Sequence, residues 1–332
     1  MQLNDNLNIQ GQKILLVGFR SYQNMGDELI LLGTIKLLLK QKKSIYVVSP
    51  NNIRLQNFLN QFIDTNQITF IDELPRGFRS LLNFLKNKPY QQIKKFLNID
   101  NIILGGGEIL TEESAHSYYY RLRSIWPALF LKKNLYIMGG IQIPNKRYNK
   151  ILFHAIIRKT QAMFLRDQDA ITALKKYGYL NAKFFMDTSY FALNNRKSYK
   201  HLSDKKYIIV NINSRGQQFF KNLVDDIKHY IKKGYEIIYL PVCAGKTDDD
   251  AQYFKQLQNE LKTFSKTQIK IYDRRPNFHE FLKMLGGADY VISARLHLFL
   301  ISEFIGLQTK VYPYQKKIKK MQTIIEKLKS SL

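Results

Sequence analysis

The chain has 332 residues, 45% of them hydrophobic, which suffices for a sizeable core and suggests two domains. Its single cysteine, Cys243, excludes an intrachain disulfide framework, and no apolar run resembles a signal core or a membrane span, so we expect a cytoplasmic protein. The 52 Lys and Arg against 26 Asp and Glu give a formal charge of +26, which favours polyanionic partners.

Short apolar runs alternate with amphipathic stretches through the first half of the chain. The predicted strands are residues 13–19, 44–49, 67–72, 101–106, 134–140, 162–165 and 182–187. The helical patterns between them cover residues 27–41, 114–132, 147–159 and 168–177. Strands that alternate with helices predict a parallel sheet covered on both faces. We therefore expect an N-terminal Rossmann-like domain over residues 1–192.

The polar segment 193–206 lacks periodicity and is predicted to be a linker. The pattern then restarts, with strands at 207–213, 236–241, 269–273 and 289–293. Helices are predicted at 218–232, 248–263 and 277–285, and one more follows the last strand and runs to about Gly306. This predicts a C-terminal Rossmann-like domain over residues 207–312. Two such α/β domains would face a cleft, with ligands at the carboxyl ends of the strands.

Residues 313–332 are predicted to form a basic amphipathic helix. Its apolar face carries Ile318, Met321, Ile325, Leu328 and Leu332. Lysines occupy the opposite face. Two interpretations remain open: the apolar face packs on the protein, or the helix lies on an anionic membrane surface.

The segment NMGDE, residues 24–28, follows the first strand and opens a helix. Gly26 permits close backbone approach, and Asp27 is expected to cap the helix. The free N–H groups at this helix end could hold a polar or anionic ligand. The pattern is neither a dinucleotide fingerprint nor a phosphate-binding P-loop.

Three glycines, 105–107, lie at and just beyond the end of the predicted strand 101–106. A tight turn needs one or two glycines, so three suggest a backbone surface that a ligand contacts closely. Glu108 and His116 stand nearby and could meet the hydroxyls of an acceptor, although each could equally be a solvated or capping residue.

Arg166 follows the strand 162–165, and its forked guanidinium suits a carboxylate or phosphate. The alternative is a structural ion pair with Asp167 or Asp187, and Asp167 is also expected to cap the next helix. The run Asp248 to Asp250 is explained more simply by helix capping than by a divalent metal. We expect no metal site.

Arg295 and His297 interrupt the apolar run ISARLHLFLIS, residues 292–302. Both side chains are costly to bury without partners. Residues two apart can converge only at a strand-to-helix junction, before regular helix begins. There an imidazole beside a guanidinium would place an acid next to an anion clamp. The alternative for His297 is an ordinary core histidine.

These residues resemble the polysaccharide pyruvyl transferase family. The resemblance spans nearly the whole chain, and the motifs occur in the family's order. They are NMGDE (24–28), GGGEIL (105–110), LRDQDA (165–170), MDTSYF (186–191), ADYVISARLHLFLIS (288–302) and YQKKI (314–318).

The resemblance implies two Rossmann-like domains in a GT-B-like arrangement around a central cleft. It implies an enzyme that moves the pyruvyl group of phosphoenolpyruvate onto two hydroxyls of a sugar, forming a cyclic ketal and releasing phosphate, without a cofactor. Arg295 and His297 would be catalytic, and Arg166, Arg295 and Lys317 would bind the donor. The residues expected to face the acceptor are Asn24, Gly26, Asp27, Gly106, Gly107 and Glu108.

The chemistry of the residues agrees with this implication. Phosphoenolpyruvate carries a carboxylate and a phosphate, which call for at least two placed cations, such as Arg166 and Arg295. Its C2 becomes electrophilic when C3 is protonated, and His297 is the expected general acid.

Two other functions remain open. A nucleotide-sugar glycosyltransferase of the same architecture would use Arg295 and Lys317 on a diphosphate and His297 as base. A non-catalytic nucleic-acid-binding protein would use the +26 charge, but the basic residues are dispersed and no recognition motif appears, so no nucleic acid is expected as a partner. Compositional drift is an alternative source of the charge. A lipid-diphosphate-linked acceptor at the cytoplasmic membrane face is a hypothesis prompted by the basic tail.

Overall fold

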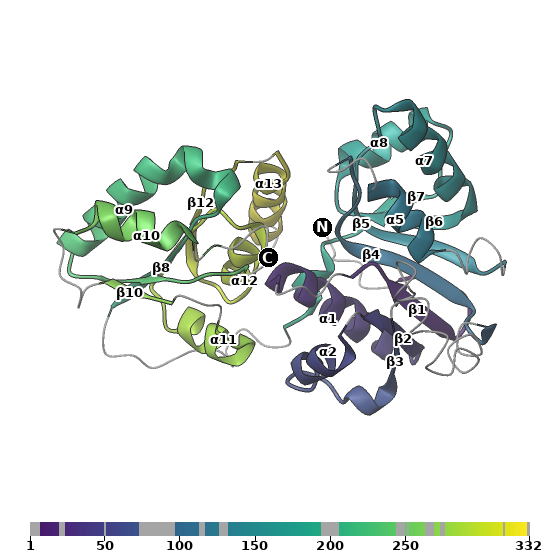
Figure 1. Ribbon diagram of the computed structural model, residues 1–332, viewed down its shortest axis with the longest axis horizontal. Helices are drawn as coiled ribbons and strands as arrows, with labels where there is room; N and C mark the ends of the chain where they lie inside the picture. The colour runs from purple at the N-terminus through teal and green to yellow at the C-terminus, as the bar shows by residue number, and fades with distance from the viewer. Residues whose placement is uncertain are drawn as a thin grey trace, which may run out of the picture. The chain divides into compact units, whose positions relative to one another are not determined.

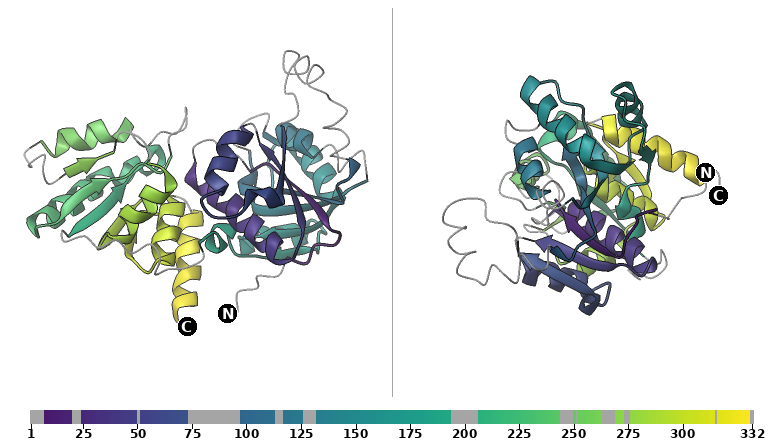
Figure 2. Two further views of the ribbon diagram at one scale, coloured as in Figure 1. Left: turned by 90° about the horizontal axis from the view of Figure 1, so that it is seen from below. Right: turned by 90° about the vertical axis from the view of Figure 1, so that its right-hand side faces the viewer.

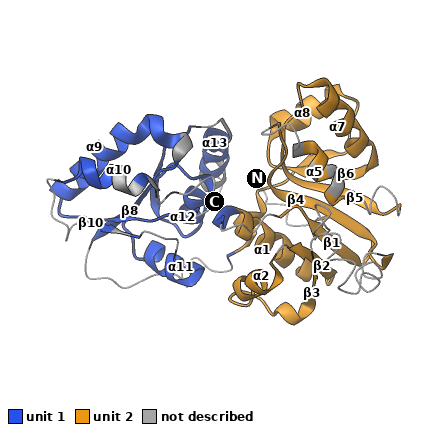
Figure 3. Ribbon diagram, in the orientation of Figure 1, with its two compact units in different colours: residues 1, 22–26, 193–332 blue, residues 2–21, 27–192 orange. Residues whose placement is uncertain are grey.

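The computed structural model describes residues 7–19, 24–49, 51–72, 97–112, 117–125, 132–193, 206–243, 250, 252–262, 269–272, 276–314 and 316–330. Two compact units make up the chain (Figure 3). The N-terminal unit contains residues 2–21 and 27–192, and the C-terminal unit contains residues 1, 22–26 and 193–332. Residues 22–26 therefore belong to the C-terminal unit despite their early position. The predicted linker lies, from 194 to 205, outside the described residues.

The N-terminal unit contains a seven-stranded sheet in which every neighbouring pair is parallel. The strand order is β3-β2-β1-β4-β5-β6-β7. From β1 the chain adds β2 and β3 on one side, and then returns to add β4 to β7 on the other side of β1. This switch point, between β1 and β4, opens a crevice at the carboxyl ends of the two strands. The strands are β1 (Lys13–Val17), β2 (Ser44–Ser49), β3 (Ile68–Asp72), β4 (Asn101–Leu110), β5 (Asn134–Ile141), β6 (Thr160–Leu165) and β7 (Ala182–Phe184).

Helices cover both faces of this sheet. In Figure 1, α5 (Ser117–Ser124), α7 (Arg147–Lys159) and α8 (Gln168–Lys176) lie on one face, and α1 (Met25–Lys40) and α2 (Asn52–Leu59) lie on the other. The strands are nearly continuous apolar runs because both of their faces are buried. Two short 3-10 turns, η1 (Thr65–Gln67) and η2 (Thr188–Phe191), complete the unit as described.

Strand β4 is longer than predicted. It runs through the three glycines to Leu110, and its register with β5 shifts between Gly105 and Glu108. The glycines therefore lie within a bulged strand rather than after it. The sequence favoured a loop because glycine is unfavourable in strand interiors, but parallel pairing with β5 continues on the far side of the bulge.

The C-terminal unit has a five-stranded parallel sheet in the order β10-β9-β8-β11-β12. Its switch point lies between β8 and β11. The strands are β8 (Tyr207–Asn211), β9 (Glu236–Tyr239), β10 (Ile269–Ile271), β11 (Tyr290–Ser293) and β12 (Gln308–Val311). The sequence did not predict β12, because this short edge strand has polar residues at three of its positions, QTKV, and lacks an apolar run.

The helices of this unit are α9 (Phe220–Lys232), α10 (Gln252–Glu260), α11 (Phe278–Gly286), α12 (Leu296–Phe304) and α13 (Lys316–Ser330). A 3-10 turn, η4 (Ser214–Phe219), precedes α9. Leu223 and Ile227 of α9 and Leu257 of α10 join one core cluster with strand residues. Helix α11 lies on the opposite side of the sheet (Figure 1). The predicted α/β class, with two parallel sheets, is confirmed.

The tail forms the predicted helix, α13, which lies at the side of the C-terminal unit (Figure 2). Ile318, Met321 and Ile325 of its apolar face are buried, so this part of the face packs on protein. No helix among the described residues is both long and apolar enough to cross a membrane.

Candidate active site

Arg295 and His297 lie at the carboxyl end of β11, beside the switch point of the C-terminal sheet. Arg295 is the N-cap of α12, with an extended backbone (φ −98°, ψ 124°), and the helix begins at Leu296. The expectation that both residues precede the regular helix is therefore right for Arg295 and wrong for His297, which lies in the first helical turn. The hydroxyl of Ser293 turns the chain just before the helix, accepting from Arg295 N–H at 2.8 Å and donating to Arg295 O at 3.1 Å.

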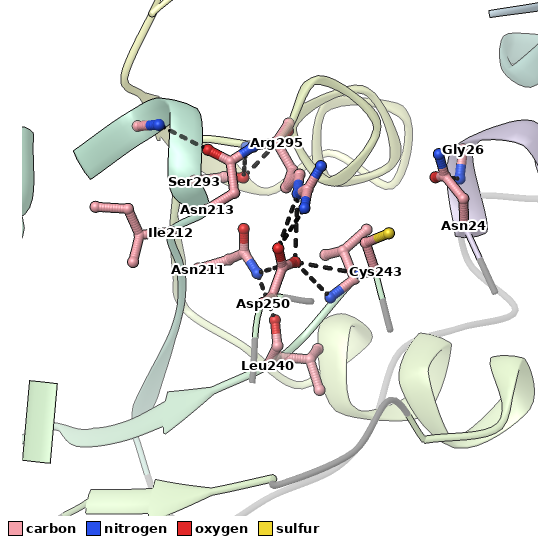
Figure 4. A network of polar contacts seen from close by, with 12 residues as sticks. Asn24, Gly26, Asn211, Ile212, Asn213, Leu240, Cys243, Asp250, Ser293 and Arg295 are labelled. Carbon is pink, nitrogen blue, oxygen red and sulfur yellow. Dashed lines mark hydrogen bonds and ion pairs between the residues drawn. The ribbon is translucent and has the colours of Figure 1, made fainter. Parts of the chain in front are cut away.

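The guanidinium of Arg295 forms an ion pair with Asp250 (Figure 4). Its Nε donates to Oδ1 at 3.0 Å and to Oδ2 at 3.3 Å, and its Nη2 also donates to Oδ1. The Arg295 side chain is 13% exposed, whereas that of Asp250 is fully buried. Two nitrogens on one edge of the guanidinium thus contact one carboxylate, which restricts its orientation.

Asp250 is in turn held by the loop that follows β9. Its Oδ2 accepts from Val242 N–H at 3.0 Å, from Cys243 N–H at 3.2 Å and from Asn211 Nδ2 at 2.9 Å. The sequence predicts a helix cap at Asp250, and its carbonyl accepts from Tyr253 N–H of α10 at 3.2 Å. Its carboxylate, however, is bound by Arg295 and by this loop. Asp248 and Asp249 lie outside the described residues. No sequence signal links Asp250 to Arg295, since 45 positions separate them.

His297 lies against the backbone of Gly26. A Cβ placed on Gly26 would fall 2.0 Å from His297 Nδ1 and 2.6 Å from Cγ, so the imidazole occupies the space of a side chain. Asn24 accepts from Gly26 N–H through Oδ1 at 3.0 Å and forms an isolated antiparallel bridge with Cys243. The structure thus brings Asn24 and Gly26 together with the Arg295 site, within the C-terminal unit.

The start of α1 differs from the prediction in one respect. The helix begins at Met25, so Asp27 lies inside the first turn and does not cap it. The Asn24 side chain bonds the Gly26 N–H instead. Asp27 and Glu28 still lie at the positive end of the helix, where acidic residues are favourable.

A polar turn after β8 lines the other side of the switch point. Asn213 Oδ1 accepts from Gly216 N–H at 2.8 Å, and Asn213 Nδ2 donates to Tyr314 at 3.2 Å. A Cβ on Gly216 would lie 2.8 Å from Ala294 Cβ, so the turn packs against the residue before Arg295. Asn211 Oδ1 is buried and accepts no hydrogen bond from the described part of the chain. No pattern in the sequence indicated this turn.

In the N-terminal unit, the glycines of β4 meet the loop after β1. Gly106 has φ +137°, a conformation that favours glycine, and a Cβ placed on it would lie 3.4 Å from the Gly18 carbonyl oxygen. The buried Arg121 supports both segments, donating from Nε to Ile109 O at 2.9 Å and from Nη1 to Gly18 O at 3.2 Å. A Cβ on Gly107 would lie 3.3 Å from Asp27 Oδ1. Asp27, Gly106, Gly107 and Glu108 are therefore neighbours within the N-terminal unit.

Arg166 follows β6 and pairs with Asp187 in the interior of the N-terminal unit. Their side chains are 7% and 2% exposed. Asp187 also accepts from Ser189 N–H at 3.1 Å, which caps η2. Asp167 caps α8, as predicted. Arg166, Asp187 and Gly106 line one small pocket together with apolar side chains.

The side chains of two predicted site residues lie outside the described structure. Lys317 lies on α13, but its side chain falls outside the described structure, as does the whole of His116. The donor-binding role of Lys317 and the acceptor role of His116 therefore stay predictions.

Comparison with known structures identifies the fold. The chain is similar to UDP-GlcNAc 2-epimerase from Neisseria meningitidis bound to UDP-GlcNAc, with 10% identity, 96% of this chain and 90% of that chain covered and a TM-score of 0.58. A second likeness is to UDP-GlcNAc 2-epimerase from Methanocaldococcus jannaschii, with 14% identity, 94% of this chain and 91% of that chain covered and a TM-score of 0.56. A third is to a glycosyltransferase from Rickettsia africae ESF-5, with 15% identity, 91% of this chain and 79% of that chain covered and a TM-score of 0.54. At such low identity these likenesses show a GT-B-type fold alone.

No curated protein sequence matches the chain significantly. A family model described as polysaccharide pyruvyl transferase, however, matches residues 24–303. That match runs from Asn24, beside the Arg295 site, to Glu303 in α12, and it covers most of the chain. The chain therefore belongs to the polysaccharide pyruvyl transferase family, a family of transferases.

Proposed function

We propose that this protein transfers the pyruvyl group of phosphoenolpyruvate to a sugar of a cell-surface polysaccharide or its precursor. The product is a cyclic pyruvate ketal, and phosphate is released. The observation that carries the proposal is the placement of Arg295 and His297 together at the start of α12, beside a sheet switch point. Membership of the family supports the choice of reaction.

The chemistry assigns each residue a step. His297, protonated, gives its proton to C3 of the enol, which turns the methylene into a methyl group and makes C2 electrophilic. A sugar hydroxyl attacks C2, and the bond from C2 to the phosphate oxygen breaks. A second hydroxyl of the same sugar closes the ketal. Of the two hydroxyl protons, one restores His297 and the other leaves on phosphate.

Arg295 supports the charge changes in this sequence. Phosphate departs with a growing negative charge, and a fixed guanidinium at a helix N-terminus is favourable for such an anion. The polar turn at Asn213 and Gly216 lies across the switch point from Arg295. We assign the donor to this crevice of the C-terminal unit, and the acceptor to the glycine-rich segment of the N-terminal unit.

The test is phosphate release from phosphoenolpyruvate by the full chain with a panel of free and diphosphate-linked pyranosides. We expect release that requires both substrates, and a ketal on the sugar detected by mass spectrometry. His297→Asn should lower turnover by about 10³-fold. His279→Asn, which changes an exposed histidine on α11 of the same unit, is the matched control and should leave turnover unchanged. Full activity of His297→Asn would contradict the assignment.

A nucleotide-sugar glycosyltransferase is the second candidate, because the fold resembles UDP-GlcNAc epimerases and a glycosyltransferase. In that case the same assay would show consumption of a sugar nucleotide and no dependence on phosphoenolpyruvate.

For the acceptor, we propose a saccharide carried on a lipid diphosphate at an anionic membrane surface. The formal charge of +26 supports this choice. Because Ile318, Met321 and Ile325 are buried, the contact would be electrostatic, through lysines such as the exposed Lys319, rather than by insertion. Flotation with vesicles containing anionic lipid tests this, with neutral vesicles as control. Protein that stays at the bottom of both gradients would contradict it.

A further inference from the structure

We propose that Asp250 is a positioning residue that fixes the guanidinium of Arg295 for the donor. This inference rests on the proposed function, because it names a residue that acts on the donor site through Arg295. It concerns a carboxylate that is fully buried, so Asp250 is not expected to touch the substrate.

Asp250 is immobilised on every side that the structure describes. Its Oδ2 accepts three hydrogen bonds besides that of Arg295, two from backbone N–H groups and one from Asn211. Its own N–H donates to Cys243 O at 3.0 Å, and its carbonyl accepts from the Tyr239 hydroxyl at 2.7 Å. A carboxylate held in this way has little freedom to move, so it restricts the position of the cation that it binds.

The carboxylate of Asp250 sets the orientation of the Arg295 guanidinium. Arginine has many rotamers, and ordering them when a ligand binds would cost affinity. Here the contacts of Nε and Nη2 with Asp250 set the plane of the guanidinium in advance, while the hydroxyl of Ser293 fixes the backbone. These contacts come from three elements that meet at the carboxyl edge of the sheet: the end of β8, the loop after β9 and the start of α12.

The experiment measures phosphoenolpyruvate binding to the full chain by calorimetry. We expect Asp250→Asn to raise Kd by about tenfold or more, because Asn removes the charge partner and keeps the shape. Asp226→Asn, which removes the partly buried carboxylate of α9 that pairs with Lys310 of β12, is the matched control and should leave Kd unchanged. In an Arg295→Gln background, Asp250→Asn should add no further loss, since it acts through Arg295. An unchanged Kd, or a loss that adds fully to that of Arg295→Gln, would overturn the proposal.

A second readout needs no substrate and no folded variant of Asp250. In ¹⁵N-arginine-labelled wild-type protein, the Nε–H of Arg295, assigned with Arg295→Lys, should exchange slowly with solvent. Exchange as fast as that of exposed arginines would overturn the proposal even if Asp250→Asn fails to fold. If wild type does not bind phosphoenolpyruvate but the Nε–H is protected, the proposed function fails and the positioning role stands.

A different observation supports a second inference: we infer that Gly26 positions the ring of His297. The hypothetical Cβ of Gly26 lies 2.0 Å from Nδ1 and 2.5 Å from Cε1, so any side chain there displaces the imidazole. Residues 24–26 are attached to the rest of the unit by the bridge between Asn24 and Cys243. The glycine of the NMGDE motif thus has a packing role toward the proposed acid.

Gly26→Ala tests this inference. We expect kcat to fall by about tenfold or more with KM for phosphoenolpyruvate little changed, because the acid moves and the cation does not. Gly287→Ala, at a glycine of the same unit with an ordinary backbone φ of −91° at the end of α11, is the control and should keep kcat. The imidazole ¹H–¹⁵N signals of His297 should shift in Gly26→Ala and not in the control, with or without catalysis. Unshifted signals in a folded variant would overturn the inference.

Discussion

Each unit of the molecule contains a buried arginine–aspartate pair directly after a sheet strand. Arg295 follows β11 and pairs with Asp250, and Arg166 follows β6 and pairs with Asp187. In both cases the aspartate is almost fully buried. Residue types and strand position therefore do not distinguish the two pairs.

The surroundings of the two aspartates differ. Asp250 is held by two backbone N–H groups and Asn211, and its arginine contacts it through two nitrogens. Asp187 divides its oxygens between Arg166 and the cap of η2, and Arg166 is the less exposed arginine, at 7% against 13%. The first pair orients a cation at a switch point, and the second ties η2 to the end of β6. Variants at Arg295 and at the Arg166–Asp187 pair test this difference, and an experiment at Lys36 tests the burial of another cation; they follow in order of expected effect.

The largest effect is expected for Arg295→Lys. Lysine keeps the charge but loses the forked, planar donor set that Asp250 orients. We expect kcat/KM to fall by about 10³-fold, equivalent to about 4 kcal/mol. Steady-state phosphate release gives the value, and circular dichroism verifies folding. Activity within a factor of ten of wild type would mean that the pair does not orient the cation.

The second effect concerns stability in the N-terminal unit. Asp187→Ala leaves the Arg166 guanidinium buried without its partner carboxylate, and we expect unfolding free energy to fall by about 3 kcal/mol. The double variant Arg166→Met, Asp187→Leu should recover most of that loss, because no charge remains buried. Urea unfolding of the two variants makes the comparison.

The same double variant sharpens the role of Arg166. If Arg166 binds the donor, as its position after a strand suggests, the folded double variant should show a raised KM for phosphoenolpyruvate. An unchanged KM would assign Arg166 to structure alone.

The smallest effect is expected at Lys36 of α1. Burial lowers its pKa to about 8, and its Nζ donates to Ala192 O at 2.6 Å. Between pH 8 and 10.5 the unfolded chain keeps the proton that the folded chain has lost, so stability should rise with pH in this window. Between pH 7.5 and pH 10, the free energy of unfolding of wild type should rise by on the order of 1 kcal/mol more than that of Lys36→Met. Urea unfolding at pH 7.5 and pH 10 measures it; no relative gain would contradict the burial of this amine.

Much of the fold was predictable because the parallel strands are continuous apolar runs between amphipathic helices. The prediction was wrong where local signals conflict with pairing. The glycines of β4 indicated a loop, yet their register with β5 resumes at Glu108. Helix α2 and strand β12 were missed because neither presents a long apolar pattern, and α1 begins earlier than Asp27 suggested.

The candidate site was predictable only in part. Arg295 and His297 stood out because a cation and an imidazole interrupt an apolar run. Their partners did not, because Asp250 and Gly26 are distant in sequence and each had a sufficient local explanation, as a cap or as a helix start. Asn213 and Gly216 carried no recognised signal.

By itself, the sequence determined the alternation of strands and helices, the two parallel sheets and the family, because apolar periodicity and ordered motifs are local properties of the chain. Only the tertiary structure decided which charges are partners and what Gly26 contacts. Such contacts depend on where strands far apart in sequence end at the same sheet edge, and on how closely one backbone approaches another residue's side chain. Neither quantity is encoded in the spacing of residues along the chain.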